Sequence, residues 1–435
     1  MEKETRNGGG PVVTKDWGMV AQKELMSTYN NQVRNAKEEG KKVVYTFIPG
    51  NLVELVNNFD LVSVYPELLG LQMGLRQSAE KYLNLGEKEG YADELCSYLK
   101  ASVGMASFDN IGPQGYKIPE PDFLLLIYSN CFTFLKWWEI LRRKYKCPIV
   151  EIHLPYNGNE GRINKESLAY GVKQLKEVVI PKLEELTGKK FDIDKLRDQL
   201  RYSAQAEEDY YHVMNLAKNK PCPIDAALNG IYYVVPINSA LRGTPEVVEF
   251  YKNLRKDIEQ RVIRGEGPFT PFGRANDQKY RLVLEGPIPW MVPESFYKIL
   301  YDEKAVIVGA TYIKVGGSYD LGWFHDPSRP LESLCEQVTN CYANHGIKTR
   351  TEVVEKHVRD FHADGILFNS IKSCKSYITG QLVMVKELEK KLGMPSAFFE
   401  TDMMDARFYS EANVKNRIES YLRMIDQKKT MGEAR

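Results

Sequence analysis

The sequence has no marked excess of either charge, because 59 lysine and arginine residues and 58 aspartate and glutamate residues leave a net charge of +1. A protein that binds nucleic acid through its phosphates is usually far more basic, so we expect no nucleic-acid partner. Long apolar runs are also missing. Phe123–Tyr128 is typical of those present and is far shorter than the roughly 20 residues of a membrane span. The N-terminus lacks the apolar core of a signal peptide. We therefore expect a cytoplasmic protein with no membrane partner.

Several familiar signatures are also absent from the sequence. There is no GxGxxG dinucleotide turn, no GxxxxGK[ST] phosphate loop, no HExxH zinc motif and no GxSxG nucleophile turn. A CxxC pair is missing too, which argues against a zinc ribbon or a ferredoxin of the usual kind. These absences exclude the common nucleotide, hydrolase and zinc sites but leave other cysteine chemistry open.

The sequence has seven cysteines, an odd number that argues against a framework of disulfides. A reducing cytoplasm disfavours disulfides in any case. The thiols are therefore expected to be buried hydrophobes, reactive groups or metal ligands. The seven residues are Cys96, Cys131, Cys147, Cys222, Cys335, Cys341 and Cys374.

Hydrophobic periodicity predicts alternating strands and helices in the first half of the chain. A flexible start precedes a helix over Met19–Ala36. Short apolar runs separated by helical patterns then predict a parallel sheet with helical crossovers. The expected strands are Lys42–Ile48, Asp122–Tyr128 and Ile149–Leu154, and the expected helices are Leu52–Phe59, Pro66–Glu89 and Phe132–Tyr145.

The middle of the chain has few strand signals, and alternation resumes after it. Long helical patterns cover Lys165–Leu186, Asp194–Lys218 and Thr244–Arg264. Later strands are expected at Tyr280–Glu285, Ala305–Tyr312, Gly365–Ile371 and Ser396–Glu400, with helices at Pro293–Tyr301, Thr349–His362, Ser376–Leu392 and Ser410–Gln427.

The pattern predicts an α/β protein with two Rossmann-like α/β domains joined by a helical segment. A length of 435 residues is consistent with more than one domain. The predicted parts are a flexible and helical start at 1–40, a first α/β domain at 41–163, a helical segment at 164–275, and a second α/β domain with a C-terminal helix at 276–435.

Two cysteines have equivalent surroundings in the two halves. LLLIYSNCFTF (124–134) and ILFNSIKSCKSY (366–377) each contain an apolar strand, a short polar turn, a cysteine and the start of a helix. Cys131 and Cys374 then lie at the sheet edge where open α/β sheets bind ligands, and a helix N-terminus favours the thiolate that ligates iron. Cys96, on the helical stretch ADELCSYLKASVGMA, could supply a third thiolate. Burial as small hydrophobes is the alternative for each.

The segments around these three cysteines resemble a known family. ELCSYLKA, LLLIYSNCFTFLKWWE and DGILFNSIKSCKSY are similar to the 2-hydroxyacyl-CoA dehydratase family of iron–sulfur proteins, and most of all to its ATP-dependent benzoyl-CoA reductases. TFIPGNLVELVNNFD and QKYRLVLEGP support this, and the resemblance extends from about Lys41 to Lys429. It implies two α/β domains with small, mostly parallel sheets and a [4Fe–4S] cluster held between them by Cys96, Cys131 and Cys374.

The resemblance also implies an activity and its partners. A core subunit of a benzoyl-CoA reductase would pair with a sister subunit, receive electrons from reduced ferredoxin through two ATP-hydrolysing activator subunits, and convert benzoyl-CoA to a cyclic dienoyl-CoA. The missing phosphate loop agrees with ATP being bound on the activators. Three thiolates would leave one iron for a non-protein ligand. The alternatives are a 2-hydroxyacyl-CoA dehydratase subunit and a non-catalytic low-potential electron carrier.

Other candidate residues carry weaker signals. His325 and His345 fall in polar stretches where a proton donor could lie, although satisfied surface histidines are commoner. Cys341, expected in a loop, is the best rival as a cluster ligand. Trp137 and Trp138 are candidates for an apolar face that meets the sister subunit, with burial in the core as the alternative. The residue that donates protons to the substrate is not identified by the sequence.

Overall fold

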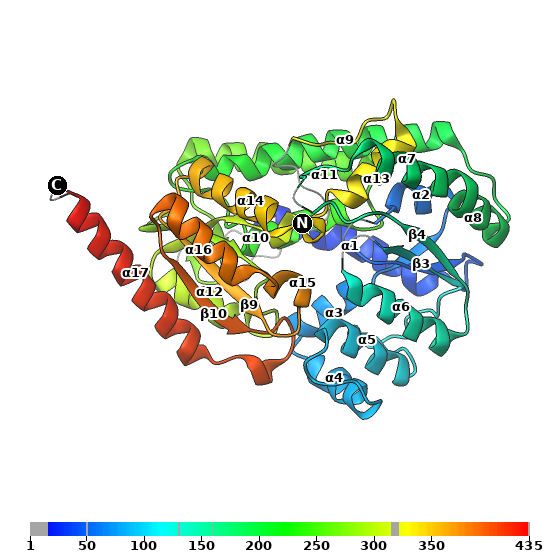
Figure 1. Ribbon diagram of the computed structural model, residues 1–435, viewed down its shortest axis with the longest axis horizontal. Coiled ribbons are helices and arrows are strands. Elements are labelled where there is room, and N and C mark those ends of the chain that lie inside the picture. Colours follow the sequence, from blue (N-terminus) through cyan, green and yellow to red (C-terminus); the bar gives the residue numbers. More distant parts are fainter. Residues whose placement is uncertain (1–15, 49–50, 129–130, 159, 315–321, 434–435) are drawn as a thin grey trace, which may run out of the picture.

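The computed structural model describes residues 16–48, 51–128, 131–158, 160–314 and 322–433. Within these residues it has two four-stranded sheets, which lie in different halves of the sequence and are surrounded by helices (Figure 1). Residues 1–15 of the predicted flexible start lie outside the described residues. None of the helices in the described part of the chain combines the length and apolar character that a bilayer span requires.

The first sheet is wholly parallel and has the strand order β2-β1-β3-β4. Its central strand β3 is a continuous apolar run that is buried except at its last residue, as expected for a strand covered on both faces. The strands are β1 Val43–Tyr45, β2 Val62–Val64, β3 Phe123–Tyr128 and β4 Ile149–His153. The helices around them are α1 Trp17–Asn35, α2 Val53–Asn58, α3 Pro66–Leu75, α4 Ala79–Lys88, α5 Ser97–Ser107 and α6 Phe132–Tyr145.

The second sheet is also parallel, in the order β10-β9-β7-β8, and its strand β9 is buried along its whole length. Helix α17 runs along this sheet and extends beyond it (Figure 1). The strands are β7 Tyr280–Glu285, β8 Ala305–Ala310, β9 Gly365–Ile371 and β10 Ser396–Thr401. The helices are α12 Pro293–Asp302, α13 Pro330–Thr339, α14 Ile347–Asp360, α15 Lys375–Ile378, α16 Gln381–Leu392 and α17 Glu411–Glu433. The predicted pair of α/β domains is confirmed.

The segment between the sheets is mainly helical. A buried ion network connects it to the first domain: Arg242 donates from Nε to Glu54 on α2 at 2.6 Å and also pairs with Glu207 on α9. Its elements are α7 Lys165–Gln174, the π-helix η1 Leu175–Val179, α8 Ile180–Thr187, α9 Ile193–Asn215, α10 Leu228–Val234, α11 Pro245–Arg264 and the hairpin β5 Phe269–Thr270 and β6 Gly273–Arg274. Each sheet lies inside the range predicted for its domain, while the limits at residues 40, 163 and 275 stay predictions.

Some predicted elements are divided or were missed. The helix expected over Pro66–Glu89 is two helices, α3 and α4, because the chain turns at Gln77, whose φ is 53°. The helix expected over Ser376–Leu392 is interrupted in the same way at Gly380, with φ of 86°. Strand β2 has only three residues and helix α10 only seven, too few for a clear period in the sequence.

Helix α6 begins and ends where the sequence predicts, but its tryptophans do not form an exposed face. Trp137 and Trp138 are 1% and 0% exposed, and their rings contact each other at 5.4 Å between centroids. Trp138 also meets Phe47 edge-on. The interface hypothesis for these two residues is therefore wrong, and the core alternative holds. On the same helix Phe132 is 60% exposed.

Helices α4 and α5, the second of which begins just after Cys96, pack closely at a glycine. A Cβ placed on Gly104 would lie 1.9 Å from the carbonyl oxygen of Tyr82, a backbone atom that cannot rotate away. A side chain at this position must push the two helices apart. The glycine therefore helps set where α5 begins relative to the rest of the first domain.

We expect Gly104→Ala to destabilise the protein by about 1–3 kcal/mol, the usual cost of forcing extra atoms into a packed core. The measurement is the midpoint of thermal unfolding. Gly230→Ala is the matched control, because its Cβ would meet the Ile313 side chain at an ordinary 3.4 Å and alanine favours a helix. Equal midpoints for Gly104→Ala and the parent chain would contradict the close contact.

Candidate functional site

The three cysteines predicted to act together line one cavity. Cys96, Cys131 and Cys374 directly precede α5, α6 and α15, so each lies at the start of a helix. The cavity has a volume of about 120 Å³. On this measure a water molecule needs only about 10–15 Å³, so the cavity admits a group of many atoms. Cys131 and Cys374 each lie between a strand and a helix, as predicted, although residues 129–130 of the first turn lie outside the described residues. Cys96 ends a turn before α5.

The three cysteines line the same cavity, but they are not arranged around a single metal ion. Within the described residues, no three cysteine, histidine, aspartate or glutamate side chains are close enough to bind a single metal ion. The ligands of an iron–sulfur cluster bind separate iron atoms, so their sulfur atoms do not need to converge on a point. Three thiols around one enclosed space are therefore a donor set that fits a cluster.

Burial controls the thiols of this cavity. It raises the pKa of Cys96 well above the usual range, and the neighbouring Cys374 adds to the rise, while the backbone N–H of Leu99 acts the other way. Burial followed by repulsion from Cys131 raises the pKa of Cys374 to about 12. The Tyr377 N–H at the start of α15 lowers the pKa of Cys374, as expected at a helix N-terminus, but burial outweighs this effect in the protein alone. A bound cation would stabilise the thiolates and reverse the balance.

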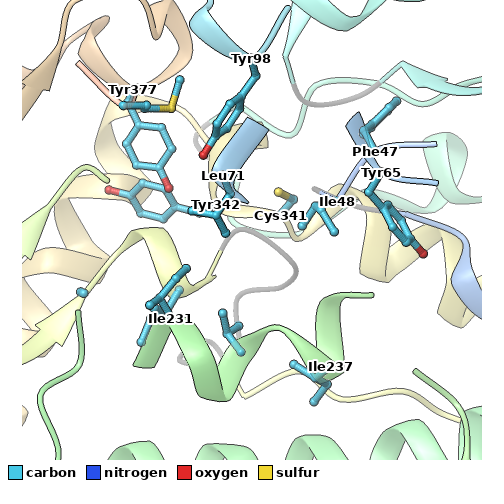
Figure 2. Packing of buried hydrophobic residues seen from close by; sticks show 14 of the residues in the cluster. Phe47, Ile48, Tyr65, Leu71, Tyr98, Ile231, Ile237, Cys341, Tyr342 and Tyr377 are labelled. Carbon is cyan, nitrogen blue, oxygen red and sulfur yellow. The ribbon is translucent and has the colours of Figure 1, made fainter. Parts of the chain in front are cut away.

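The walls of the cavity are mainly apolar and come from all parts of the chain. Figure 2 shows Leu71 and Tyr98 of the first domain, Ile231 of α10 and Tyr377 of the second domain around one region. The Tyr98 and Tyr312 hydroxyl oxygens lie 3.3 Å apart. The other apolar lining residues are Ile48, Leu68, Phe134, Trp137, Val234, Val235, Ala343 and Met403. Such a lining suits a flat hydrophobic group.

Glu67 is a functional candidate that the sequence did not reveal. It lies at the second position of α3 and is the one carboxyl group among the described lining residues. The Ile48 N–H donates to its Oε1 at 3.2 Å, while its buried Oε2 has no hydrogen-bond partner. Burial raises its pKa to about 8, so the group is a neutral acid at neutral pH and can donate a proton. An acidic residue in the first turn of a helix is common, so its position in the sequence carried no signal.

The remaining cysteines do not line the cavity. Cys222 is buried, and its Sγ donates to the Ile224 carbonyl oxygen at 2.9 Å. Cys335 is buried as well, and Cys147 is half-buried. Cys341 lies in the loop after α13, as expected, but it is buried, and burial raises its pKa to about 12. Its role as the alternative ligand stays a prediction.

The two histidines are structural and not surface groups. Both His325 and His345 are buried, and neither is among the residues that line the cavity. The His325 backbone N–H donates to Glu207 Oε2 at 2.9 Å, which places this histidine in the buried network around Arg242. Burial lowers the pKa of His345 to about 4, so it is neutral at physiological pH. Both residues lie outside the named helices and strands, as expected, but the alternative that they are surface histidines is wrong.

Comparison with known proteins indicates the same family as the sequence resemblance, over almost the whole chain. The family described as "2-hydroxyglutaryl-CoA dehydratase, D-component" matches residues 51–425. A benzoyl-CoA reductase subunit of Thauera aromatica is 49% identical over 420 residues, which are 97% of each chain. The (R)-2-hydroxyisocaproyl-CoA dehydratase alpha subunit of Clostridioides difficile is 26% identical over 421 residues, 96% of this chain and 98% of the relative.

A third relative, the (R)-phenyllactyl-CoA dehydratase alpha subunit of Clostridium sporogenes, is 25% identical over 396 residues, 91% of this chain and 92% of its own. All three relatives are named as subunits. The family match, the near-complete coverage and the segments around Cys96, Cys131 and Cys374 agree, and we conclude that this chain belongs to the 2-hydroxyacyl-CoA dehydratase and benzoyl-CoA reductase family.

Proposed function

We propose that this chain is the iron–sulfur core subunit of an ATP-dependent, cytoplasmic benzoyl-CoA reductase. The observation that carries the proposal is that Cys96, Cys131 and Cys374 line one apolar cavity formed by both domains. The 49% identity to a benzoyl-CoA reductase subunit, against 26% to the C. difficile dehydratase subunit, favours the reductase within the family.

In this proposal the three thiolates hold a [4Fe–4S] cluster, which supplies single electrons from the low end of the roughly −700 to +450 mV range of such centres. The electrons come from reduced ferredoxin through two activator subunits that hydrolyse ATP, and a sister subunit completes the core. Benzoyl-CoA takes up two electrons and two protons, and a cyclohexadienoyl-CoA results. The ring loses one double bond and nothing else is released.

The cavity residues have three tasks in this reaction. The apolar walls bind the aromatic ring and exclude water, which would otherwise protonate the reduced ring without control. The Tyr98 and Tyr312 hydroxyls provide hydrogen-bonding groups in a mainly apolar wall. Glu67 holds a proton at Oε2, next to the space that the ring would occupy, and gives it to the radical anion, after which it is a carboxylate held by the Ile48 N–H.

The ligand assignment predicts the effect of single substitutions on iron content. Cys96→Ser, Cys131→Ser and Cys374→Ser should each lose most of the iron, because a serine oxygen is a poor ligand for an iron–sulfur cluster. Cys147→Ser is the control, since Cys147 is similarly half-buried but lies outside the cavity. Iron and sulfide are measured after anaerobic purification with the co-expressed sister subunit. Full iron and an unchanged [4Fe–4S] spectrum in Cys96→Ser would refute the assignment.

The role of Glu67 predicts a change in turnover without a change in binding. Glu67→Gln keeps an acceptor for the Ile48 N–H but cannot donate an acid proton, so we expect the reduction rate to fall on the order of 10²-fold with normal iron content. In the parent enzyme the rate should decrease as the pH rises past about 8, because the protonated form is lost, and the variant should lack this dependence.

Glu294→Gln is the matched control for this variant. Glu294 also follows a proline at the start of a helix, α12, but it is exposed and does not line the cavity. Its substitution should leave the rate and its pH dependence unchanged. A Glu67→Gln enzyme with the parent rate at all pH values would show that another group supplies the proton.

The dehydratase subunits among the relatives make water elimination the second candidate function. A reductase consumes electrons in every turnover, whereas a dehydratase recycles one electron through many turnovers. We therefore expect the assembled complex, given benzoyl-CoA and a low-potential donor, to form ADP in constant proportion to dienoyl-CoA. Elimination of water from a 2-hydroxyacyl-CoA after one priming electron, with benzoyl-CoA unchanged, would favour the dehydratase. Electron passage with neither substrate converted would favour the carrier.

A further inference from the structure

One buried carboxylate joins the two segments that carry Cys96 and Cys374. The Ser97 hydroxyl donates to Asp402 Oδ1, and the Ser373 hydroxyl donates to Asp402 Oδ2. The two hydroxyl oxygens lie 2.7 Å apart. Ser97 directly follows Cys96, and Ser373 directly precedes Cys374. A single side chain therefore contacts the immediate neighbour of each cysteine.

The three residues come from different elements and from both domains. Ser97 is the first residue of α5 in the first domain, and Ser373 lies in the turn between β9 and α15 in the second. Asp402 follows β10, which pairs in parallel with β9, and the Lys372 N–H donates to the Thr401 carbonyl oxygen at 2.9 Å. The carboxyl end of the second sheet thus presents Asp402 to the start of α5.

The carboxylate is fully buried and held from several directions. Asp402 is 0% exposed. Besides the two hydroxyls, it accepts from the backbone N–H groups of Ser373, Met404 and Asp405 at 3.1, 3.1 and 3.2 Å. Five donors leave little freedom for the side chain, so the distance between its two serine partners is fixed.

The charge of Asp402 is not neutralised by a basic side chain in the described part of the chain. The basic groups on neighbouring segments, Lys100 and Arg407, pair with Asp405 and Glu87 instead. The carboxylate contacts the residues next to Cys96 and Cys374, so its charge lies close to both cysteines. A fixed negative charge close to a redox centre disfavours the added electron and lowers the reduction potential.

We propose that Asp402 is a positioning residue that holds Cys96 and Cys374 in register across the two domains, and that its charge keeps the reduction potential of the bound cluster low. The inference rests on the proposed function, because it concerns the cluster that the cavity would hold. The serine hydroxyls link Asp402 to the segments that carry the two cysteines, and the negative charge of Asp402 lowers the reduction potential of the cluster. The two effects can be separated by substitution.

Asp402→Asn tests the charge, because asparagine has the same shape but is neutral. We expect the equilibrium for one-electron reduction of the cluster to shift at least tenfold toward the reduced form, which is about 59 mV upward. The midpoint potential is measured by an anaerobic titration followed by electron paramagnetic resonance, on the complex with the sister subunit. Asp225→Asn is the control, because Asp225 is also a buried carboxylate that accepts backbone N–H groups, but these belong to Ala227, Leu228 and Ile307 and not to the neighbours of the cavity cysteines.

Ser97→Ala and Ser373→Ala test the positioning while keeping the carboxylate. Each should lower the iron bound per chain at least twofold and alter the resonance spectrum of the remaining cluster. Ser102→Ala is the control on α5, since the Ser102 hydroxyl is buried and has no hydrogen-bond partner. If Asp402→Asn does not fold, the two serine variants still test the positioning role.

The outcomes separate this inference from the function it rests on. A parent complex without iron would refute the cluster itself, and the Asp402 role with it. A parent complex with its cluster, an unchanged potential in Asp402→Asn and full iron in both serine variants would refute the Asp402 role alone. The Asp402 role is supported if Asp402→Asn raises the potential, Ser97→Ala and Ser373→Ala lower the bound iron, and the control variants do neither.

Discussion

The enclosure of three thiols in an apolar cavity is the constraint on which the rest of the site depends. Burial makes Cys96 and Cys374 hold their protons, so the cavity does not favour free thiolates. The dipoles at the helix starts are too weak to overcome the loss of water around the sulfur atoms. The three thiols are therefore expected to lose their protons only when a cation binds in the cavity. The same exclusion of water raises the pKa of Glu67, which makes it a neutral acid. It also strengthens the electrostatic effect of a buried carboxylate such as Asp402, because the interior screens charge less than water does.

The features that the sequence predicted well depend on short segments. Strands β7 and β9 and helix α6 have the predicted bounds because each is a continuous pattern with a clear start and end. Cys131 and Cys374 could be located because strand, turn and cysteine follow one another directly. Cys96 has no such strand before it, so the residues alone indicated it only as a possible third thiolate, and the resemblance to a family then supported its place in the group.

The features that the sequence did not predict depend on packing between distant segments. Helix α6 has contacts with both β3 and α5, so its two adjacent tryptophans are both buried. Glu67 looks like an ordinary first-turn carboxylate until the cavity is formed around it. Asp402 gains its partners only because β10 pairs beside β9 and α5 meets the end of that sheet. The periodicity of the sequence does not indicate such contacts between distant segments.

The distribution of the cavity cysteines between the two domains also has a consequence for biosynthesis. A ribosome completes the first domain, with Cys96 and Cys131, long before it reaches Cys374. During that interval the partly made chain has two of the three thiols and no second wall to enclose them. If the three cysteines hold the proposed cluster, its insertion follows the docking of the second domain. A chain that ends before its last sheet lacks Cys374 or the wall around it, so the complete set of three thiols exists only in the full-length protein.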